Sequence, residues 1–419
     1  MMKYIQFATF CLIAISAHAK VMTGLDNLVA EHFAPLKGRH VGLITNQTGR
    51  ARGGAFGAEL FSKSKALTLV ALFAPEHGLF GTRAAGVPSD TLERLDGVPI
   101  YSLYGSTRKP THAMLRGIDA LVFDIQDAGV RPYTYLSTMI DAMESAAENK
   151  IPFYVLDRPN PLSGDRIEGN ILDSSLESFV GIIPVPYLHG MTLGELAQMA
   201  KAKAWFRGAA KLKLTVIPMT GWKRSMYWNE TGLEWIATSP NVPDFANDVG
   251  LAMLGATGEL GLLSIGIGSD FPFLRIGSTL MGQDEIQRFV DSAFQPPPDP
   301  LLLKEGGLLF LPEDFTATTS GGMKTYHGVR IELPSALKSI SSLYEPQFRI
   351  IEMMLHDPAF RASFDELPAS TNARYEKVTG MHGLLDMLRR CEDLSPVFSN
   401  WRSDDERFRD DRAPFLLYP

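Results

Sequence analysis

The chain has 419 residues, of which 45% are hydrophobic and 21% are charged. This balance is typical of a soluble globular protein and excludes both a disordered chain and one embedded in a membrane. The 40 basic and 47 acidic residues give a formal net charge of −7, so a nucleic-acid-binding protein is not expected. The two cysteines, Cys11 and Cys391, exclude a disulfide framework and a zinc site made of several cysteines.

Residues 1–19 have the pattern of a secretory signal peptide. Lys3 supplies the positive charge, residues 5–16 form an apolar stretch, and residues 17–19 give an A-x-A cleavage site. Cleavage there starts the mature protein at Lys20. Because no cysteine follows the apolar stretch directly, no membrane anchor is expected. The sequence therefore predicts a periplasmic or secreted protein.

Short apolar runs recur after the signal peptide, each bounded by turn residues. They are continuous rather than alternating, as is typical of strands buried on both faces of a parallel sheet. The runs that we predict as strands lie at residues 41–44, 67–73, 118–125, 151–156 and 211–217.

Helical patterns separate these runs. Residues 134–149 place Leu136, Ile140 and Met143 at helical spacing. A second helix is predicted from a capping box at residues 192–195 through residue 206. This alternation favours an α/β fold, a Rossmann-like doubly wound sheet with helices on both faces.

A proline-rich segment at residues 295–300 marks a division of the chain, because neither a helix nor a central strand continues through it. We predict a helix before it at residues 284–293, and after it a strand at residues 329–333 and a helix at residues 383–390. The boundary is set at 280, which gives a Rossmann-like domain over residues 20–280 and a smaller C-terminal α+β domain over residues 281–419.

Polar side chains collect where the predicted strands end. In doubly wound sheets, ligands bind outside the carboxyl ends of the strands. Four successive strand ends here carry reactive or hydrogen-bonding groups, which argues for a site. These residues are Asn46, Glu76, His77, Asp124, Asp127, Arg131, Tyr133, Tyr135, Asp157, Arg158 and Asn160.

Several roles are open for these groups. The carboxylates suit acid, base or nucleophile chemistry, and the arginines suit an anionic substrate group. Arg158 has the alternative of a salt bridge to Asp157 or Asp127, and Asp124 has the alternative of a structural role. Glu76 is the strongest functional candidate, because Pro75 and Gly78 hold it in a tight turn.

Several familiar mechanisms have no motif in the sequence. There is no G-x-G-x-x-G for a dinucleotide, no G-x-x-x-x-G-K-[ST] for a nucleotide phosphate and no G-x-S-x-G for a serine nucleophile. His77 and His189, together with Asp127 or Asp157, lack the spacing of metal ligands. The sequence predicts neither a cofactor nor a metal.

Taken together, the motifs resemble one family, the secreted exo-β-N-acetylmuramidases of NamZ type. The likeness runs from about residue 24 to residues 416–418. It rests on the segments Gly42-Leu43-Ile44-Thr45-Asn46-Gln47-Thr48-Gly49, Pro75-Glu76-His77-Gly78, Ser102-Leu103-Tyr104-Gly105, Asp124-Ile125-Gln126-Asp127 through Arg131 and Tyr133-Thr134-Tyr135, Asp157-Arg158-Pro159-Asn160-Pro161, His189-Gly190-Met191-Thr192 with Glu195, and Ser239-Pro240-Asn241-Val242-Pro243.

The resemblance implies an active site in a cleft between a Rossmann-like domain and a smaller C-terminal domain that completes the cleft. It implies release of β-1,4-linked N-acetylmuramic acid from the non-reducing ends of peptidoglycan fragments, with Glu76 as the leading catalytic candidate. The chain departs from the family's E-G-T-N-x-S-x-G-R-G pattern at residues 259–268. There Leu262 and Ile267 replace a polar and a basic residue.

The predicted site follows from these arguments. Glycoside cleavage needs one proton-transferring carboxyl group and a second group on the other face of the sugar. We assign the first role to Glu76, and the second to Asp127, Asp157 or a tyrosine, with Tyr135 as the candidate. Arg131, then Arg158 and Arg83, are the candidates for binding the lactyl carboxylate. The predicted substrate-binding residues are Asn46, His77, Arg131, Asp157, Arg158, Asn160, His189 and Asn241.

Whether the reaction retains or inverts configuration stays open at this point, as does participation of the substrate's acetamido group. The competing hypothesis is a periplasmic protein that binds sugars or muropeptides without turning them over, because such a protein also needs a cleft, aromatic rings and arginines.

Overall fold

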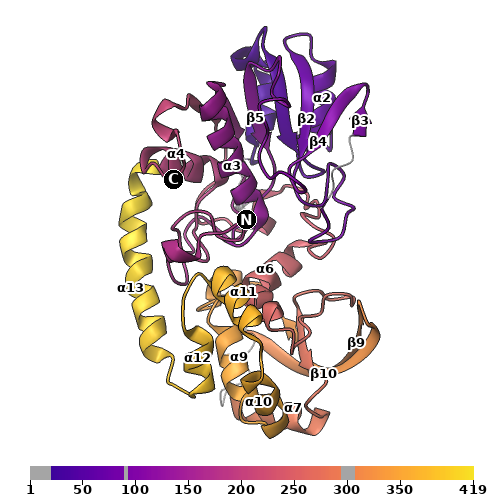
Figure 1. Cartoon of the computed structure of the whole chain (residues 1–419), viewed down its shortest axis with the longest axis vertical. Coiled ribbons are helices and arrows are strands. Elements are labelled where there is room, and N and C mark those ends of the chain that lie inside the picture. The colour runs from indigo at the N-terminus through magenta and orange to yellow at the C-terminus, as the bar shows by residue number, and fades with distance from the viewer. Residues whose placement is uncertain (1–19, 89–92, 294–306) are drawn as a thin grey trace, which may run out of the picture.

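The computed structural model describes residues 20–88, 93–293 and 307–419. The predicted signal peptide lies outside these residues. The described chain forms two parts, one above the other in Figure 1, and the long helix α13 (Ser395–Arg412) runs along both. Within the described residues no helix is long and apolar enough to cross a membrane.

The N-terminal part is built around a seven-stranded sheet in the order β3-β4-β2-β1-β5-β6-β7. All neighbouring strands are parallel except β3 and β4. The strands are β1 (His40–Thr45), β2 (Thr68–Ala74), β3 (Glu93–Leu95), β4 (Val98–Ser102), β5 (Ala120–Asp124), β6 (Phe153–Leu156) and β7 (Leu214–Ile217). This architecture confirms the predicted doubly wound α/β fold.

Side chains alternate between the two faces of this sheet, and each face carries a helical layer. Leu43, Leu72 and Val122 pack with helices α1 (Gly24–Ala30) and α2 (Gly57–Lys63). Their chain neighbours, including Ile44 and Phe123, pack on the opposite face against α3 (Thr134–Asn149) and α4 (Leu193–Ala202). The capping box that predicted the start of α4 is present, with Thr192 and Glu195 bonded in both directions.

The C-terminal part contains a three-stranded antiparallel sheet in the order β8-β10-β9. The strands are β8 (Arg275–Ser278), β9 (Leu309–Thr319) and β10 (Gly322–Glu332). Because β8 pairs with β10, this sheet includes residues on both sides of position 280. The helices of this part are α6 (Phe245–Leu254), α7 (Gln283–Ala293), α9 (Pro346–Met354), α10 (Pro358–Asp365), α11 (Ala369–Thr379) and α12 (Leu384–Arg389).

Arg131 links the two parts at their junction. Its side chain is fully buried and donates to the carbonyl oxygens of Asn170 and Val185 in the N-terminal part, both at 2.8 Å. It also donates to the carbonyl oxygens of Val378 and Thr379 at the end of α11, at 3.5 and 2.6 Å. Gly380 follows at a φ of 69°, where a Cβ would lie 2.4 Å from Arg131 Nη2, so only glycine fits there.

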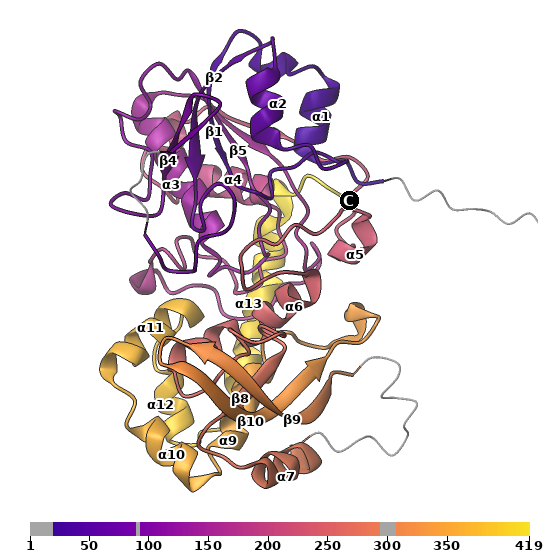
Figure 2. The same cartoon turned by 90° about the vertical axis from the view of Figure 1, so that its right-hand side faces the viewer.

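The last residues of the chain return to the N-terminal part, as the position of the C-terminus beside α4 in Figure 1 and below α1 in Figure 2 indicates. The Tyr418 hydroxyl donates to Asp157 Oδ2 at 2.5 Å, and Leu417 N donates to Glu195 Oε1 at 2.9 Å. Arg412 is buried and donates to the carbonyl oxygens of Gly164 and His189. Residues far apart in the sequence thus complete one core.

We expect Arg131→Met to lower the free energy of unfolding by about 3 kcal/mol or more. The substitution leaves buried carbonyl oxygens without a donor, and each such group costs about 1–3 kcal/mol. Urea unfolding followed by circular dichroism measures the change. The exposed Arg116 supplies the control, since Arg116→Met should change stability by less than about 0.5 kcal/mol. Equal effects in the two variants would show that the carbonyl contacts of Arg131 add nothing.

Candidate active site

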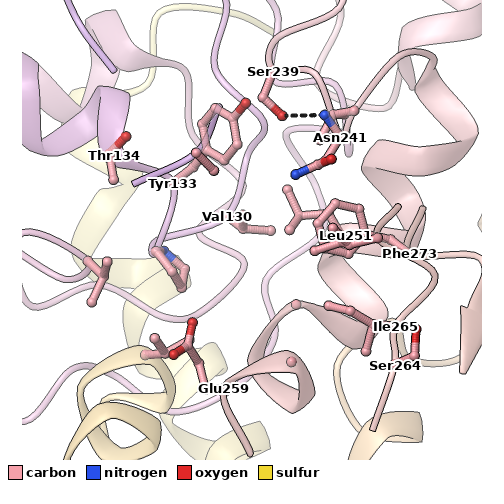
Figure 3. Close-up of a pocket in the computed structure, with 18 of the residues that line it drawn as sticks. Val130, Tyr133, Thr134, Ser239, Asn241, Leu251, Glu259, Ser264, Ile265 and Phe273 are labelled. Atoms are coloured by element: carbon pink, nitrogen blue, oxygen red, sulfur yellow. Dashed lines mark hydrogen bonds between the residues drawn. The ribbon is translucent and has the colours of Figure 1, made fainter. Parts of the chain in front are cut away.

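A pocket of about 610 Å³ opens between the two parts of the molecule. The N-terminal part contributes Glu76, His77, Tyr133 and Thr134 to its lining, and the C-terminal part contributes α6, residues 255–273 and the β9–β10 hairpin. Figure 3 shows Tyr133 and Thr134 on one side of this pocket, with Ser239 and Asn241 across from them.

Glu76 is held firmly at the edge of the pocket. It lies in the turn that follows β2, and it is only 8% exposed. Oε1 accepts a hydrogen bond from Gly86 N, and Oε2 accepts one from the Thr134 hydroxyl, both at 2.8 Å. These two donors come from different elements, so the carboxyl group has a defined orientation. Burial raises the pKa of the neighbouring Tyr104, and the Glu76 carboxylate raises it further.

His77 lies next to Glu76 in the same turn, with a φ of 69°. Its Nδ1 donates to the carbonyl oxygen of Arg83 at 2.8 Å, which stabilises the loop that follows the turn. Both His77 and Glu76 line the pocket, as the sequence predicted. Asn241, on the opposite wall, is the third predicted residue in the lining, and its side-chain amide accepts or donates no hydrogen bond within the described residues.

Three further predicted residues lie behind the pocket wall in a buried polar cluster. The Tyr135 hydroxyl is fully buried and donates to the carbonyl oxygen of Thr238 at 2.5 Å. Asp127 accepts from Gly129 N through Oδ2, while its Oδ1 has no hydrogen-bond partner in the part of the chain that the structure describes. Asn46 accepts from Thr48 through Oδ1, and its Nδ2 likewise has no partner among those residues. None of the three lines the pocket.

Asp248 on α6 joins this buried cluster, and no sequence motif indicated it. It is fully buried, and neither carboxyl oxygen has a hydrogen-bond partner among the described residues. Burial raises the pKa of Asp248 well above its usual range, and the Asp127 carboxyl raises it further. Burial also raises the pKa of Asp127, to about 7. Two buried carboxyl groups with raised pKa values thus lie behind the pocket.

The remaining predicted residues have structural partners outside the pocket lining. Asp157 accepts from Gly194 N and from the hydroxyls of Thr192 and Tyr418, while burial raises its pKa to about 6. Asn160 bonds to Leu162 N and to the carbonyl oxygen of Met191. Burial lowers the pKa of His189 to about 3, so its ring is neutral.

The arginines do not enter the pocket either. Arg131 is enclosed by carbonyl oxygens, and Arg83 forms an ion pair with Glu93. Arg158 forms the kind of salt bridge that we considered as its alternative, but its partner is Asp124 at 2.7 Å rather than Asp157 or Asp127. Among the described lining residues there is no lysine or arginine, whereas Glu76 and Glu259 are both acidic.

Several lining groups were not assigned a catalytic or substrate-binding role from the sequence, although Tyr133 is among the polar residues that follow the predicted strands. Tyr133 and Thr134 lie directly before Tyr135, and Ser239 lies two residues before Asn241. The hairpin tip adds Thr318, Thr319 and Ser320 from a segment that carries no motif. Within the described residues, no group of three or more histidine, cysteine, aspartate or glutamate residues lies close enough together to hold a metal ion.

Comparison with known proteins agrees with this geometry. Residues 41–246 match the family model "Exo-beta-N-acetylmuramidase NamZ, N-terminal", and residues 249–418 match "Exo-beta-N-acetylmuramidase NamZ, C-terminal". The chain belongs to the NamZ family. The two models meet inside α6.

A characterised relative and two crystal structures extend the comparison. The chain is 34% identical over 415 residues to the peptidoglycan beta-N-acetylmuramidase NamZ of Bacillus subtilis (strain 168), covering 95% of this chain and 92% of the relative. Two DUF1343 family proteins from Bacteroides fragilis NCTC 9343 have similar structures, with TM-scores of 0.85 and 0.73 and identities of 34% and 26%. Each match covers 96% of this chain and 99% of the other.

The two departures from the NamZ family pattern have different positions. Ile267 lines the pocket and is 40% exposed, whereas Leu262 packs against the C-terminal core and is absent from the lining. A basic group at position 267 would therefore face the pocket, and this chain has an apolar side chain there instead.

We expect Asp127→Asn to reduce the decline in the free energy of unfolding that accompanies a rise in pH. A carboxyl group whose pKa rises on folding stabilises the protein below its unfolded pKa, and this contribution is lost as the pH rises through the folded pKa. For Asp127 the window runs from 3.8 to about 7, so the loss amounts to about 4 kcal/mol at most. Urea unfolding of both proteins between pH 4 and pH 8 should show a smaller decline for the variant.

The exposed Asp270 provides the matched control for this measurement. Asp270→Asn makes the same chemical change without burial and should leave the decline as it is in the unmodified protein. Parallel declines in all three proteins would contradict a raised pKa of Asp127.

Proposed function

We propose that this protein is a glycoside hydrolase that releases N-acetylmuramic acid from the non-reducing ends of peptidoglycan fragments. The observation that carries the proposal is Glu76, a carboxyl group held by Gly86 N and Thr134 at the edge of a pocket between the two parts. The chain's membership of the exo-β-N-acetylmuramidase family supports the same reaction. The family models and the Bacillus relative have the names of hydrolases, and neither favours a protein that binds sugars without turnover.

The shape of the pocket suits a chain end. Its walls come from the N-terminal part, the segment around Ser239 and the C-terminal part, so it takes a terminal sugar more readily than the middle of a long strand. Tyr133 presents its ring to the pocket and Phe273 faces it from the C-terminal side (Figure 3). Aromatic rings of this kind pack well on the apolar face of a sugar.

Glu76 has the acid–base role in this mechanism. The hydrogen bonds from Gly86 and Thr134 fix the carboxyl group, so that a proton is exchanged with the glycosidic oxygen from one direction. Asp127 and Asp157 lie behind the wall and do not reach the sugar directly. Burial raises the pKa of Tyr133, and the charges of Asp248 and Asp127 raise it further, so this tyrosine keeps its hydroxyl proton.

Neutral donors recognise the lactyl carboxylate that distinguishes N-acetylmuramic acid from N-acetylglucosamine. No arginine or lysine is found in the described part of the lining. The side-chain amide of Asn241 points into the pocket (Figure 3), and the hydroxyls of Ser239 and Ser320 lie in the same lining. A neutral donor still binds a carboxylate through a charge-assisted hydrogen bond.

We place the reaction in the periplasm or outside the cell. Residues 1–19 supply the reason, because their charge, apolar stretch and A-x-A site are those of an exported protein. Peptidoglycan lies outside the cytoplasmic membrane, so an exported hydrolase meets its substrate there.

Glu76→Gln should lower kcat by roughly 10²–10⁴-fold on a chromogenic N-acetylmuramic acid glycoside, because it removes the proton that general acid–base catalysis transfers. The glutamine keeps the shape and can still bond to Gly86 N and Thr134, so folding should be intact. Steady-state kinetics on the purified protein measure the loss.

Glu259 provides the matched control, because it is the other carboxylate in the described lining. Its side chain is 39% exposed and lies 3.6 Å from Arg374. We expect Glu259→Gln to keep kcat within about tenfold. An equal loss in both variants would remove the special role of Glu76, and turnover that persists in Glu76→Gln would exclude it from the mechanism.

Asn241→Asp tests how the lactyl carboxylate is recognised. The new carboxylate replaces a donor and repels the substrate's negative charge, so kcat/KM for the muramic acid glycoside should fall roughly 10–150-fold. The matching N-acetylglucosamine glycoside lacks the carboxylate and should lose little. If both glycosides lose activity equally, Asn241 does not recognise the lactyl group.

A further inference from the structure

A second pocket, of about 250 Å³, lies at the carboxyl edge of the same sheet. Thr48 follows β1, Gln126 follows β5 and Arg158 follows β6, and all three line it together with the loop of residues 50–54. This is the region outside the strand ends where doubly wound sheets bind ligands.

The segment 232–241 separates this second pocket from the first. Its residues Gly232, Leu233, Glu234 and Ile236 line the second pocket, whereas Ser239 and Asn241 line the first. Gln47 Nε2 donates to the carbonyl oxygens of Ala237 and Thr238, at 2.7 and 3.2 Å, and so holds the segment in place between them. The second pocket is therefore a distinct site and not an extension of the cleft.

Arg158 is the central group of the second pocket. It is only 7% exposed, and its Nε donates to Asp124 Oδ1 while its Nη2 donates to the carbonyl oxygen of Arg50, at 2.7 and 3.0 Å. Its Nη1 has no hydrogen-bond partner within the described residues. The guanidinium group is thus fixed in orientation with donors left over for a ligand. A fixed fork of donors suits a planar or tetrahedral oxyanion.

Two more arginines line the pocket, and their charges are not neutralised. Arg50 donates to the carbonyl oxygens of Gln47 and Gly54, and Arg52 donates to those of Val21 and Gly232. Neither forms an ion pair within the described residues. Glu234 is the one acidic residue in the described lining. Because Asp124 pairs with Arg158 from behind the lining, the charges left are those of Arg50 and Arg52 against Glu234, a net charge of +1 in a chain whose formal charge is −7.

The loop of residues 50–54 contributes exposed main-chain atoms to the lining of this pocket. Gly53 and Gly54 have φ values of 95° and 88°, and nothing lies within 4 Å of where their Cβ atoms would be. The main chain is therefore open to a ligand at this point. At roughly 30 Å³ per water molecule, the pocket has room for about eight waters, so a phosphate group with a small organic substituent fits.

We propose that this second pocket binds a small dianionic oxyanion of the phosphate class, either inorganic phosphate or the phosphate monoester of a small molecule, with Arg158 as the central ligand. The fixed guanidinium, the unneutralised Arg50 and Arg52 and the open glycine backbone all suit this chemistry, and the net positive charge of the lining attracts an anion. The site stands independently of the proposed hydrolysis, because it shares no lining residue with the first pocket.

Isothermal titration calorimetry of the full mature chain with inorganic phosphate tests the proposal. Sodium succinate, a dicarboxylate of the same charge, is titrated at matched ionic strength to separate phosphate from carboxylate recognition. We expect one phosphate to bind per chain and succinate to bind at least tenfold more weakly. Arg158→Met should weaken phosphate binding at least tenfold. Bound phosphate should also raise the midpoint of thermal unfolding, because a ligand of the folded state stabilises it.

If Arg158→Met fails to fold, a second pair of variants tests phosphate binding by this pocket. Ala51 lines the pocket and is half-buried, so Ala51→Glu places a negative charge there, while Ala51→Gln adds the same bulk without charge. We expect phosphate binding to be lost in Ala51→Glu and to be largely kept in Ala51→Gln. Asn241→Asp, in the first pocket, should leave phosphate binding unchanged.

Four outcomes would overturn the proposal. They are no phosphate binding, binding that survives Ala51→Glu, an equal loss in the two Ala51 variants, and loss through Asn241→Asp. Succinate binding as tight as that of phosphate would overturn the phosphate class.

Discussion

The cleft depends on a charge that is buried without a counter-charge. Arg131 binds carbonyl oxygens of both parts of the molecule, and no carboxylate takes part. The partial charges of the peptide groups thus replace a salt bridge, and burial lowers the pKa of Arg131 to about 10. Because carbonyl oxygens do not titrate, Arg131 keeps its hydrogen bonds over the whole pH range in which carboxylates change charge.

Two further sets of contacts join the two parts of the molecule at this junction. Tyr187 and Tyr344, one from each part, stack with ring centroids 3.9 Å apart. Glu168 Oε2 accepts from the Ser342 hydroxyl and from the backbone N–H groups of Leu343 and Tyr344. The pocket walls are therefore held at a defined separation, as proton transfer from a positioned carboxyl group requires.

The helices and strands could be predicted where the pattern of apolar residues along the sequence shows which positions are buried. Continuous apolar runs predicted β1, β2, β5, β6 and β7 to within a few residues, and residues 134–149 form α3 as predicted. The long hairpin of β9 and β10 was found only in part, at residues 329–333. Its strands alternate buried and exposed positions irregularly and include many polar side chains, so no clear period marks them.

Predicted site residues reach the pocket where a turn constrains the side chain, and lie away from it where packing decides the direction of the side chain. Glu76 and His77 line the pocket because the tight turn after β2 turns them toward it. Tyr133 and Tyr135 look equivalent in the sequence, but Tyr133 precedes α3 and faces the pocket, whereas Tyr135 lies within α3 and points into the core. Nothing in the sequence distinguishes Asp248 from other polar residues of a helix. Only the structure shows that its buried carboxyl oxygens have no hydrogen-bond partner among the described residues.

The return of the chain's end to the N-terminal part has a consequence for the order of events in synthesis. Leu417 N bonds to Glu195, Tyr418 bonds to Asp157, and the carbonyl oxygen of Pro419 accepts from Arg224 N. A ribosome makes these residues about 200 positions after the sheet, so the Rossmann-like part is synthesised before Glu195 and Asp157 receive these donors. Its complete set of buried hydrogen bonds therefore forms only after the C-terminal part has been made.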